Sequence, residues 1–100
     1  MSRKRKRNSP KCPLCRKYYC HKRRISHHHI FCRYWYSINV TVEVCSQCHQ
    51  KEFNRLYPMD LKGDPWSLSL CLHNWVEFCK IKGKNAFLIY PKLTKLEPLY

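Results

Sequence analysis

The stretch "INVTVEVCSQCH" at residues 38–49 joins an alternating segment to two cysteines and a histidine. Every second residue from Ile38 to Val44 is apolar, and polar residues lie between them, which is typical of a strand buried on one face. Cys45 and Cys48 follow at the C-x-x-C spacing, which lets two thiolates of one turn bind the same zinc ion. We therefore expect a strand that runs directly into half of a metal site.

The other half of this site is expected at "CPLC", where Cys12 and Cys15 repeat the C-x-x-C spacing. Two such pairs complete a four-thiolate zinc site, and a chain of 100 residues often needs a staple of this kind. The alternative is that one pair is redox-active or simply buried. No βαβ pattern supports a thioredoxin-like interpretation.

Positive charge dominates the first part of the chain. The formal net charge is +14, and no acidic residue precedes Glu43. Such a surface attracts a polyanion, so we expect DNA as the partner, with RNA as a second polyanion and no membrane. Residues 1–11 predict a disordered basic arm, although its charges could also form only a solvated tail. The side chains expected to contact nucleic acid are Arg3, Lys4, Arg5, Lys6, Arg7, Lys22, Arg23 and Arg24.

The start of the chain also bears on its compartment. No apolar run approaches the roughly 20 residues of a membrane span. The basic start is not followed by the apolar stretch of a secretory signal. We therefore expect an intracellular protein, in a nucleus or nucleoid, with "KRKR" as a nuclear-address pattern. Reduced thiols in such a compartment favour metal binding over disulfides.

Two helices are predicted after the second cysteine pair. The first begins at Ser46 as its N-cap, ends before Pro58, and would bury Phe53, Leu56 and Tyr57. The second spans residues 63–83, with Asp64 as the cap, Pro65 in the first turn and Gly83 at the stop. Its apolar stripe is Leu68, Leu72, Trp75, Val76 and Cys79.

The predicted fold class is therefore α+β. "AFLIYP" at residues 86–91 predicts a short final strand. We expect a zinc-stapled core at residues 12–58, and a C-terminal extension at residues 59–100 that packs on this core.

The region between the cysteine pairs contains "HHI" at His28 to Ile30 and then Asn39, and the second pair is directly followed by His49. In this order, residues 12–57 resemble the HNH endonuclease family, whose core is the ββα-metal fold. The resemblance implies that His29 is the general base and that Asn39 orients it. It also implies that His28 and His49 bind a catalytic divalent ion.

One further ligand is expected from the helix. Many members of this family carry a histidine one turn after the helix ligand, where this chain has Phe53. Glu52 lies three residues after His49, on the same helix face, and could substitute for that histidine. Mg²⁺ is the expected catalytic ion by availability, although imidazole ligands favour zinc, nickel or cobalt.

The chemistry of these residue types agrees with the resemblance. A neutral imidazole titrates near the working pH and can take a proton from water. A divalent ion polarises a phosphate and stabilises the leaving oxygen. Successive strand residues point to opposite faces, so His28 and His29 should have different roles, and His27 has no assigned role.

The predicted function is metal-dependent nicking or cleavage of DNA with low sequence specificity, by an HNH-type hydrolase. The alternative is a non-catalytic, zinc-stabilised nucleic-acid-binding protein, in transcription or packaging, that keeps the same fold. A third possibility is an interaction protein whose second helix docks its apolar stripe on a partner. Without the cysteines and His49, the histidine run would indicate only a solvated cationic strand.

Overall fold

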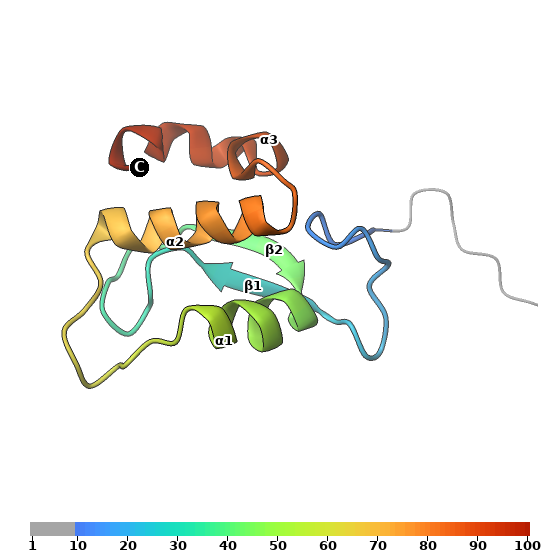
Figure 1. The fold of residues 1–100 in the computed structure, drawn as a ribbon, viewed down its shortest axis with the longest axis horizontal. Helices are drawn as coiled ribbons and strands as arrows, with labels where there is room; N and C mark the ends of the chain where they lie inside the picture. The colour runs from blue at the N-terminus through green and yellow to red at the C-terminus, as the bar shows by residue number, and fades with distance from the viewer. Residues whose placement is uncertain (1–9) are drawn as a thin grey trace, which may run out of the picture.

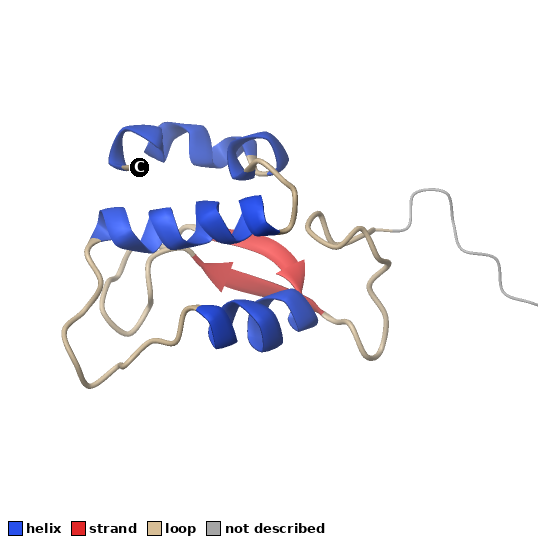
Figure 2. Ribbon diagram, viewed as in Figure 1, coloured by secondary structure: helices blue, strands red, loops and turns tan. Residues whose placement is uncertain are grey.

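A computed structural model describes residues 10–100 and shows a two-stranded sheet surrounded by helices (Figures 1 and 2). This arrangement confirms the predicted α+β class. The segment at residues 1–9, which carries most of the predicted basic arm, lies outside the described residues. The elements in chain order are β1 (Ile25–His29), β2 (Thr41–Cys45), η1 (Gln47–Phe53), α1 (Asn54–Leu56), α2 (Leu68–Ile81), α3 (Ala86–Ile89) and η2 (Pro91–Leu99).

The sheet is an antiparallel hairpin in which His28 lies opposite Val42 and His29 lies opposite Thr41. Because side chains alternate along a strand, His28 and Val42 share the inner face, where both are buried. The predicted strand began at Ile38, but Ile38 is 38% exposed and β2 starts only at Thr41. The chain before Thr41 belongs to the loop that connects the two strands.

The helix after the second cysteine pair starts where predicted, but its details differ. Ser46 has helical backbone angles instead of the extended ones of a capping residue, and its side chain makes no cap. Its N–H donates to the Arg24 carbonyl at 2.8 Å. The first turns, in η1, are of the wider π type, which rotates later residues away from the phase of an ordinary helix. Phe53 is buried as predicted, whereas Leu56 is 46% exposed, so its place in the buried stripe was wrong.

The second helix, α2, begins later than predicted. Its cap is Ser67, whose Oγ accepts a hydrogen bond from the Leu70 N–H at 3.1 Å, so the predicted cap at Asp64 was wrong. The Tyr36 hydroxyl donates to the Trp66 carbonyl at 2.6 Å, which ties the preceding residue to the hairpin loop. The predicted end is confirmed, since Gly83 follows the helix with a φ of 77°.

The segment predicted as a final strand is the short helix α3, so that prediction was wrong. The Asn85 side chain caps it by accepting from the Phe87 N–H at 2.9 Å. Pro91 then begins the 3₁₀ helix η2. The Tyr90 hydroxyl donates to the Glu43 carbonyl at 2.9 Å, so the chain covers the edge of β2 with side chains instead of another strand.

Trp75 of α2 lies at the centre of the core and is fully buried. Its ring contacts His28 of β1, Phe53 of η1 and Tyr90 after α3, with centroid distances of 4.3, 5.1 and 6.4 Å. In Figure 1, α2 lies between the hairpin and the C-terminal helices α3 and η2. The two halves of the chain therefore share one core. None of the helices within residues 10–100 combines the length and the apolarity needed to cross a membrane.

Phe78→Ala tests whether this core is shared. Phe78 is fully buried, and its ring lies 5.3 Å from that of Phe53, so the truncation leaves a cavity between the two halves. We expect the free energy of unfolding, measured by urea denaturation of the metal-loaded protein, to fall by about 3–5 kcal/mol in a single transition.

The matched control is Leu88→Ala, because Leu88 is 76% exposed. Its free energy of unfolding should stay within about 0.5 kcal/mol of the wild-type value. Two separate transitions in the Phe78 variant would show that the halves fold independently.

Candidate metal centre and histidine site

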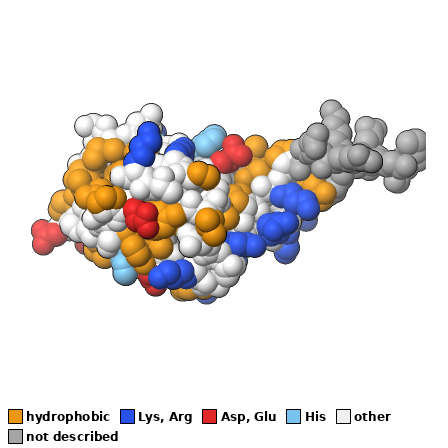
Figure 3. Space-filling model, turned by 90° about the horizontal axis from the view of Figure 1, so that it is seen from above, with side chains coloured by type: hydrophobic (Ala, Val, Ile, Leu, Met, Phe, Trp, Pro, Cys, Tyr) orange, Lys and Arg blue, Asp and Glu red, His pale blue; other side chains and the backbone are white. Residues whose placement is uncertain are grey.

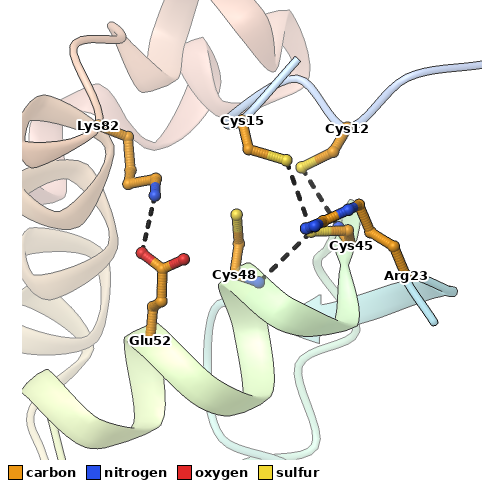
Figure 4. Close-up of polar contacts among 7 residues, drawn as sticks. All are labelled: Cys12, Cys15, Arg23, Cys45, Cys48, Glu52 and Lys82. Atoms are coloured by element: carbon orange, nitrogen blue, oxygen red, sulfur yellow. Dashed lines mark hydrogen bonds and ion pairs between the residues drawn. The ribbon is translucent and has the colours of Figure 1, made fainter. Parts of the chain in front are cut away.

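Four thiols converge where the two cysteine turns meet (Figure 4). The Sγ atoms of Cys12, Cys15, Cys45 and Cys48 all lie within 4.8 Å of one another. The Cys15 and Cys45 sulfurs are 3.8 Å apart, and tetrahedral zinc with Zn–S bonds of about 2.3 Å places its sulfurs about 3.8 Å apart. The predicted grouping of these four cysteines is confirmed, and the cluster can hold a structural metal ion such as zinc.

The local backbone prepares this cluster for a cation. In the first turn, the Arg16 N–H donates to the Cys12 carbonyl at 2.8 Å, and Arg16 adopts a φ of 63° to reverse the chain. The Cys45 N–H points at the Cys12 sulfur at 3.4 Å, and the Cys48 N–H points at the Cys45 sulfur at the same distance. A hydrogen bond from the Cys48 thiol lowers the pKa of Cys12 far below its usual value. These donors favour the thiolate, the form that binds metal, at Cys12, whereas burial raises the pKa of Cys15 and the hydrogen bond with Cys12 raises that of Cys48.

Arg23, predicted to contact nucleic acid, lies beside the thiol cluster. Its guanidinium is 3.9 Å from the Cys45 sulfur (Figure 4). In this structure it therefore adds positive charge beside the thiols. Lys22 and Arg24 are exposed. Figure 3 shows several Lys and Arg side chains gathered at one end of the described part of the molecule. The predicted contacts from Arg3 to Arg7 lie outside the described residues.

The remaining cysteines stay apart from the cluster. Cys71 and Cys79 are buried in α2, as predicted for Cys79, whereas Cys20 is exposed and Cys32 is half-buried. Within residues 10–100, no second group of three or more Cys, His, Asp or Glu side chains converges as a metal site.

His28 and His49 meet on the inner face of the hairpin. The His28 Nδ1 atom lies 3.2 Å from the His49 Nε2 atom, and the His49 Nδ1 atom lies 2.7 Å from the Ser26 Oγ atom. Two imidazoles on one tetrahedral ion, with metal–nitrogen bonds of 2.0–2.1 Å, have nitrogens about 3.4 Å apart. The observed spacing suits a shared proton and is also close to that of two ligands of one ion.

The surroundings of this pair favour neutral rings. His28 is only 4% exposed, with its ring stacked on Trp75 and the edge of Phe53 against it. Burial lowers the pKa values of both His28 and His49, so their nitrogen lone pairs are available at neutral pH. The His28 Nε2 atom is buried and has no hydrogen-bond partner among residues 10–100. Nδ1 is therefore the nitrogen that His28 can offer to an ion.

His29 faces the opposite side of the hairpin. It lines an open hollow of about 490 Å³ together with Arg33 and Asn39. The sequence prediction paired His29 with Asn39, and the structure brings both to this hollow. Desolvation, with the charges of Arg33 and His27, lowers the pKa of His29. The imidazole is therefore neutral near pH 7 and partly open to solvent.

Two other candidates have partners of their own. Glu52 was predicted as a further ligand, but its Oε1 atom pairs with the Lys82 ammonium at 2.7 Å (Figure 4). It therefore does not join the histidine pair in this structure. His27, which had no predicted role, lies 3.7 Å from the Glu43 carboxylate on the outer face.

Sequence reasoning missed two residues that shape the histidine pair, Ser26 and Trp75. Ser26 could have been found, because it lies two residues before His28 and therefore on the same strand face. Trp75 was predicted only as part of an apolar stripe, and no local pattern connects it with His28.

The fold and the thiol cluster define a small α+β protein with a four-cysteine cluster that can hold a metal ion. No protein-family model matches the chain, and no curated protein or solved structure matches it either. Any assignment of function therefore depends on the geometry described above.

Cys48→Ser tests the metal centre. We expect the wild-type protein to contain one tightly bound zinc ion per chain by mass spectrometry, and the variant to lose it. Structural zinc contributes about 10–16 kcal/mol of binding free energy. This equals or exceeds the typical 5–15 kcal/mol stability of a domain, so the variant should also lose its helical circular dichroism.

Cys20→Ser is the control, because Cys20 is exposed and outside the cluster. This variant should keep both zinc and helical signal. Full zinc occupancy in the Cys48 variant would show that the four thiols do not form the site.

Proposed function

We propose that the protein is a metal-dependent endonuclease that nicks or cleaves DNA phosphodiester bonds. The observation that carries the proposal is the division of two neighbouring histidines between the faces of β1. His28 meets His49 at 3.2 Å on one face, and His29 opens into a hollow on the other. Phosphodiester hydrolysis needs an ion and a base that reach the same phosphate, and two adjacent residues of β1 supply one candidate for each role.

His28 and His49 would hold the divalent ion, and the rest of the site keeps their rings in place. The Ser26 hydroxyl bonds the nitrogen of His49 that faces away from His28, and the stacked Trp75 ring sets the plane of His28. Outer contacts of this kind orient metal-binding imidazoles. When bound, the ion would supply positive charge to the phosphate and the leaving oxygen. Magnesium is favoured by cellular availability and zinc, nickel or cobalt by the imidazole ligands.

His29 would act as the general base. Its lowered pKa keeps the ring neutral, and its partial exposure lets water reach it. Arg33 lines the same hollow and would attract the phosphate. Asn39 lies there too, where its amide can contact either the base or the substrate.

We infer the class of substrate, a nucleic acid, from the positive charge of the chain. Exposed Lys22 and Arg24 precede β1, and the basic segment at residues 3–7 adds further positive charge. Contacts of this kind are made to phosphates, which carry no base information, so cleavage should have low sequence specificity. DNA is the proposed substrate and RNA the second candidate, which suits a protein of the nucleus or nucleoid.

A second candidate function, nucleic-acid binding without catalysis, is favoured because other side chains cover the proposed ion site. Trp75 and Phe53 cover His28, and Lys82 holds Glu52 in an ion pair. The ion would then have only two of the expected protein ligands, and catalytic sites also need open positions. A zinc-stabilised nucleic-acid-binding protein without catalysis fits these contacts.

His29→Ala tests the enzyme directly. We expect the wild-type protein to nick supercoiled plasmid only when a divalent ion is added, with the products followed on agarose gels. Loss of a general base typically lowers the rate by about 10²–10⁴-fold, and plasmid binding should persist.

His73→Ala is the matched control, since His73 is an exposed histidine on α2 that stacks on Tyr100, away from His29. Nicking by this variant should stay within a few-fold of wild type. Tight plasmid binding without nicking in Mg²⁺, Mn²⁺, Zn²⁺, Ni²⁺ or Co²⁺ would instead support the non-catalytic protein.

The ion site can be tested without activity. Calorimetric titration of the zinc-loaded protein with Ni²⁺ should reveal one additional, weaker site per chain. His49→Ala removes one of the two proposed nitrogen ligands, so this site should be lost while the zinc remains.

His73→Ala provides the comparison, because His73 is exposed on α2 and stacks on Tyr100. It should bind Ni²⁺ as the wild-type protein does. Equal Ni²⁺ affinity in both variants would rule out the histidine pair as the ion site.

A further inference from the structure

The 3₁₀ helix η2 lies, across a hollow, beside the connection that leads into β2. Near its start, the Tyr90 hydroxyl bonds the Glu43 carbonyl of β2. Further along, Lys92, Lys95 and Leu96 line one hollow with Asn39 and Val40. The C-terminal helix therefore lies next to a residue of the His29 hollow.

The packing of η2 holds its two lysines in position. A 3₁₀ helix has three residues per turn, so residues three apart lie on the same side. Leu93 is fully buried and Leu96 packs against the core, so these two leucines anchor one side of the helix. Lys92 and Lys95 have the same spacing, and about 6 Å of helix rise separates them, so their ammonium groups can contact separate phosphates.

The hollows on this face adjoin one another. Asn39 lines both the His29 hollow and the hollow of Lys92 and Lys95, and no acidic residue lines either one. Lys92 also lines a third hollow, which contains Lys11 and one acidic residue, Glu43. Within residues 10–100, neither Lys92 nor Lys95 forms an ion pair, so their charges are available to a ligand.

We propose that Lys92 and Lys95 bind the phosphodiester backbone of nucleic acid beside the His29 hollow. The strand would run from Arg33, past His29, onto η2. This surface rests on the proposed function for its ligand class, but binding there does not require cleavage. It gives the C-terminal half of the chain a role in holding substrate as well as in completing the core.

Another lysine-bearing hollow, at the end of α2, fits a phosphate less well. It contains Lys80 and Lys84 but also Glu97. Lys80 is already paired with Glu77 at 3.1 Å, and the Tyr100 hydroxyl bonds the same carboxylate at 2.6 Å. The ion pair of Lys80 and the carboxylate of Glu97 disfavour a polyanion there, whereas neither η2 lysine is held in an ion pair within residues 10–100 and the hollow that they share has no acidic residue.

The test is the double variant Lys92→Gln with Lys95→Gln in the full chain. Binding to a fluorescein-labelled 20-base-pair DNA duplex is measured by anisotropy between 50 and 200 mM salt. Each lost phosphate contact reduces the slope of log affinity against log salt by about 0.9, so the slope should fall by about 1.8. At about 0.1 M salt this corresponds to a loss of affinity of roughly 60-fold.

The matched control is Lys51→Gln with Lys62→Gln, which removes the same charge from exposed lysines outside these hollows. Its slope should change by less than half of the expected effect. Equal slopes in the two double variants would overturn the η2 surface, even if wild type binds and nicks. No binding of wild type at 50 mM salt would overturn both proposals, whereas lysine-dependent binding without nicking would leave the surface and remove the nuclease.

Discussion

The convergence of four thiols at the junction of β2 and η1 is the constraint on which the remaining structure depends. Cys45 ends the strand and Cys48 lies in the first helical turn, so their sulfurs tie that junction to the turn of Cys12 and Cys15. The position of His49, the next residue, follows from this tie. An ion on the thiols would therefore hold the helix against β1 and keep His49 opposite His28.

The second constraint is that successive side chains of β1 point to opposite faces of the hairpin. This alternation places the two neighbouring histidines in different environments. His28 is enclosed by aromatic rings, whereas His29 faces an open, basic hollow. The C-terminal half contributes to both sides, because Trp75 covers the inner histidine and η2 lies beside the outer hollow. The site and the extension are thus one structural unit, which is why an isolated ββα core would lack part of its surroundings.

The sequence predicted correctly the features that follow from residue spacing or from the period of a helix. It failed where several nearby residues could cap the same helix, or where tertiary contacts decide between helix and strand. The C-x-x-C pairs and the buried stripe of α2 needed only local spacing. The cap at Asp64 was wrong because Ser67 offers a nearer acceptor and Trp66 is held by the hairpin loop. The final strand was wrong because Asn85 caps a helix there, and side chains already cover the edge of β2.

By itself, the sequence determined the four-cysteine grouping, the order of strand and helix around it, and the opposite facing of His28 and His29. These features follow from residue spacing and strand period, which act over a few positions. Only the tertiary structure decided that Trp75 stacks on His28 and that Lys82 holds Glu52. Those contacts join residues 30 or more positions apart, and they depend on how α2 packs across the core, which no local pattern specifies.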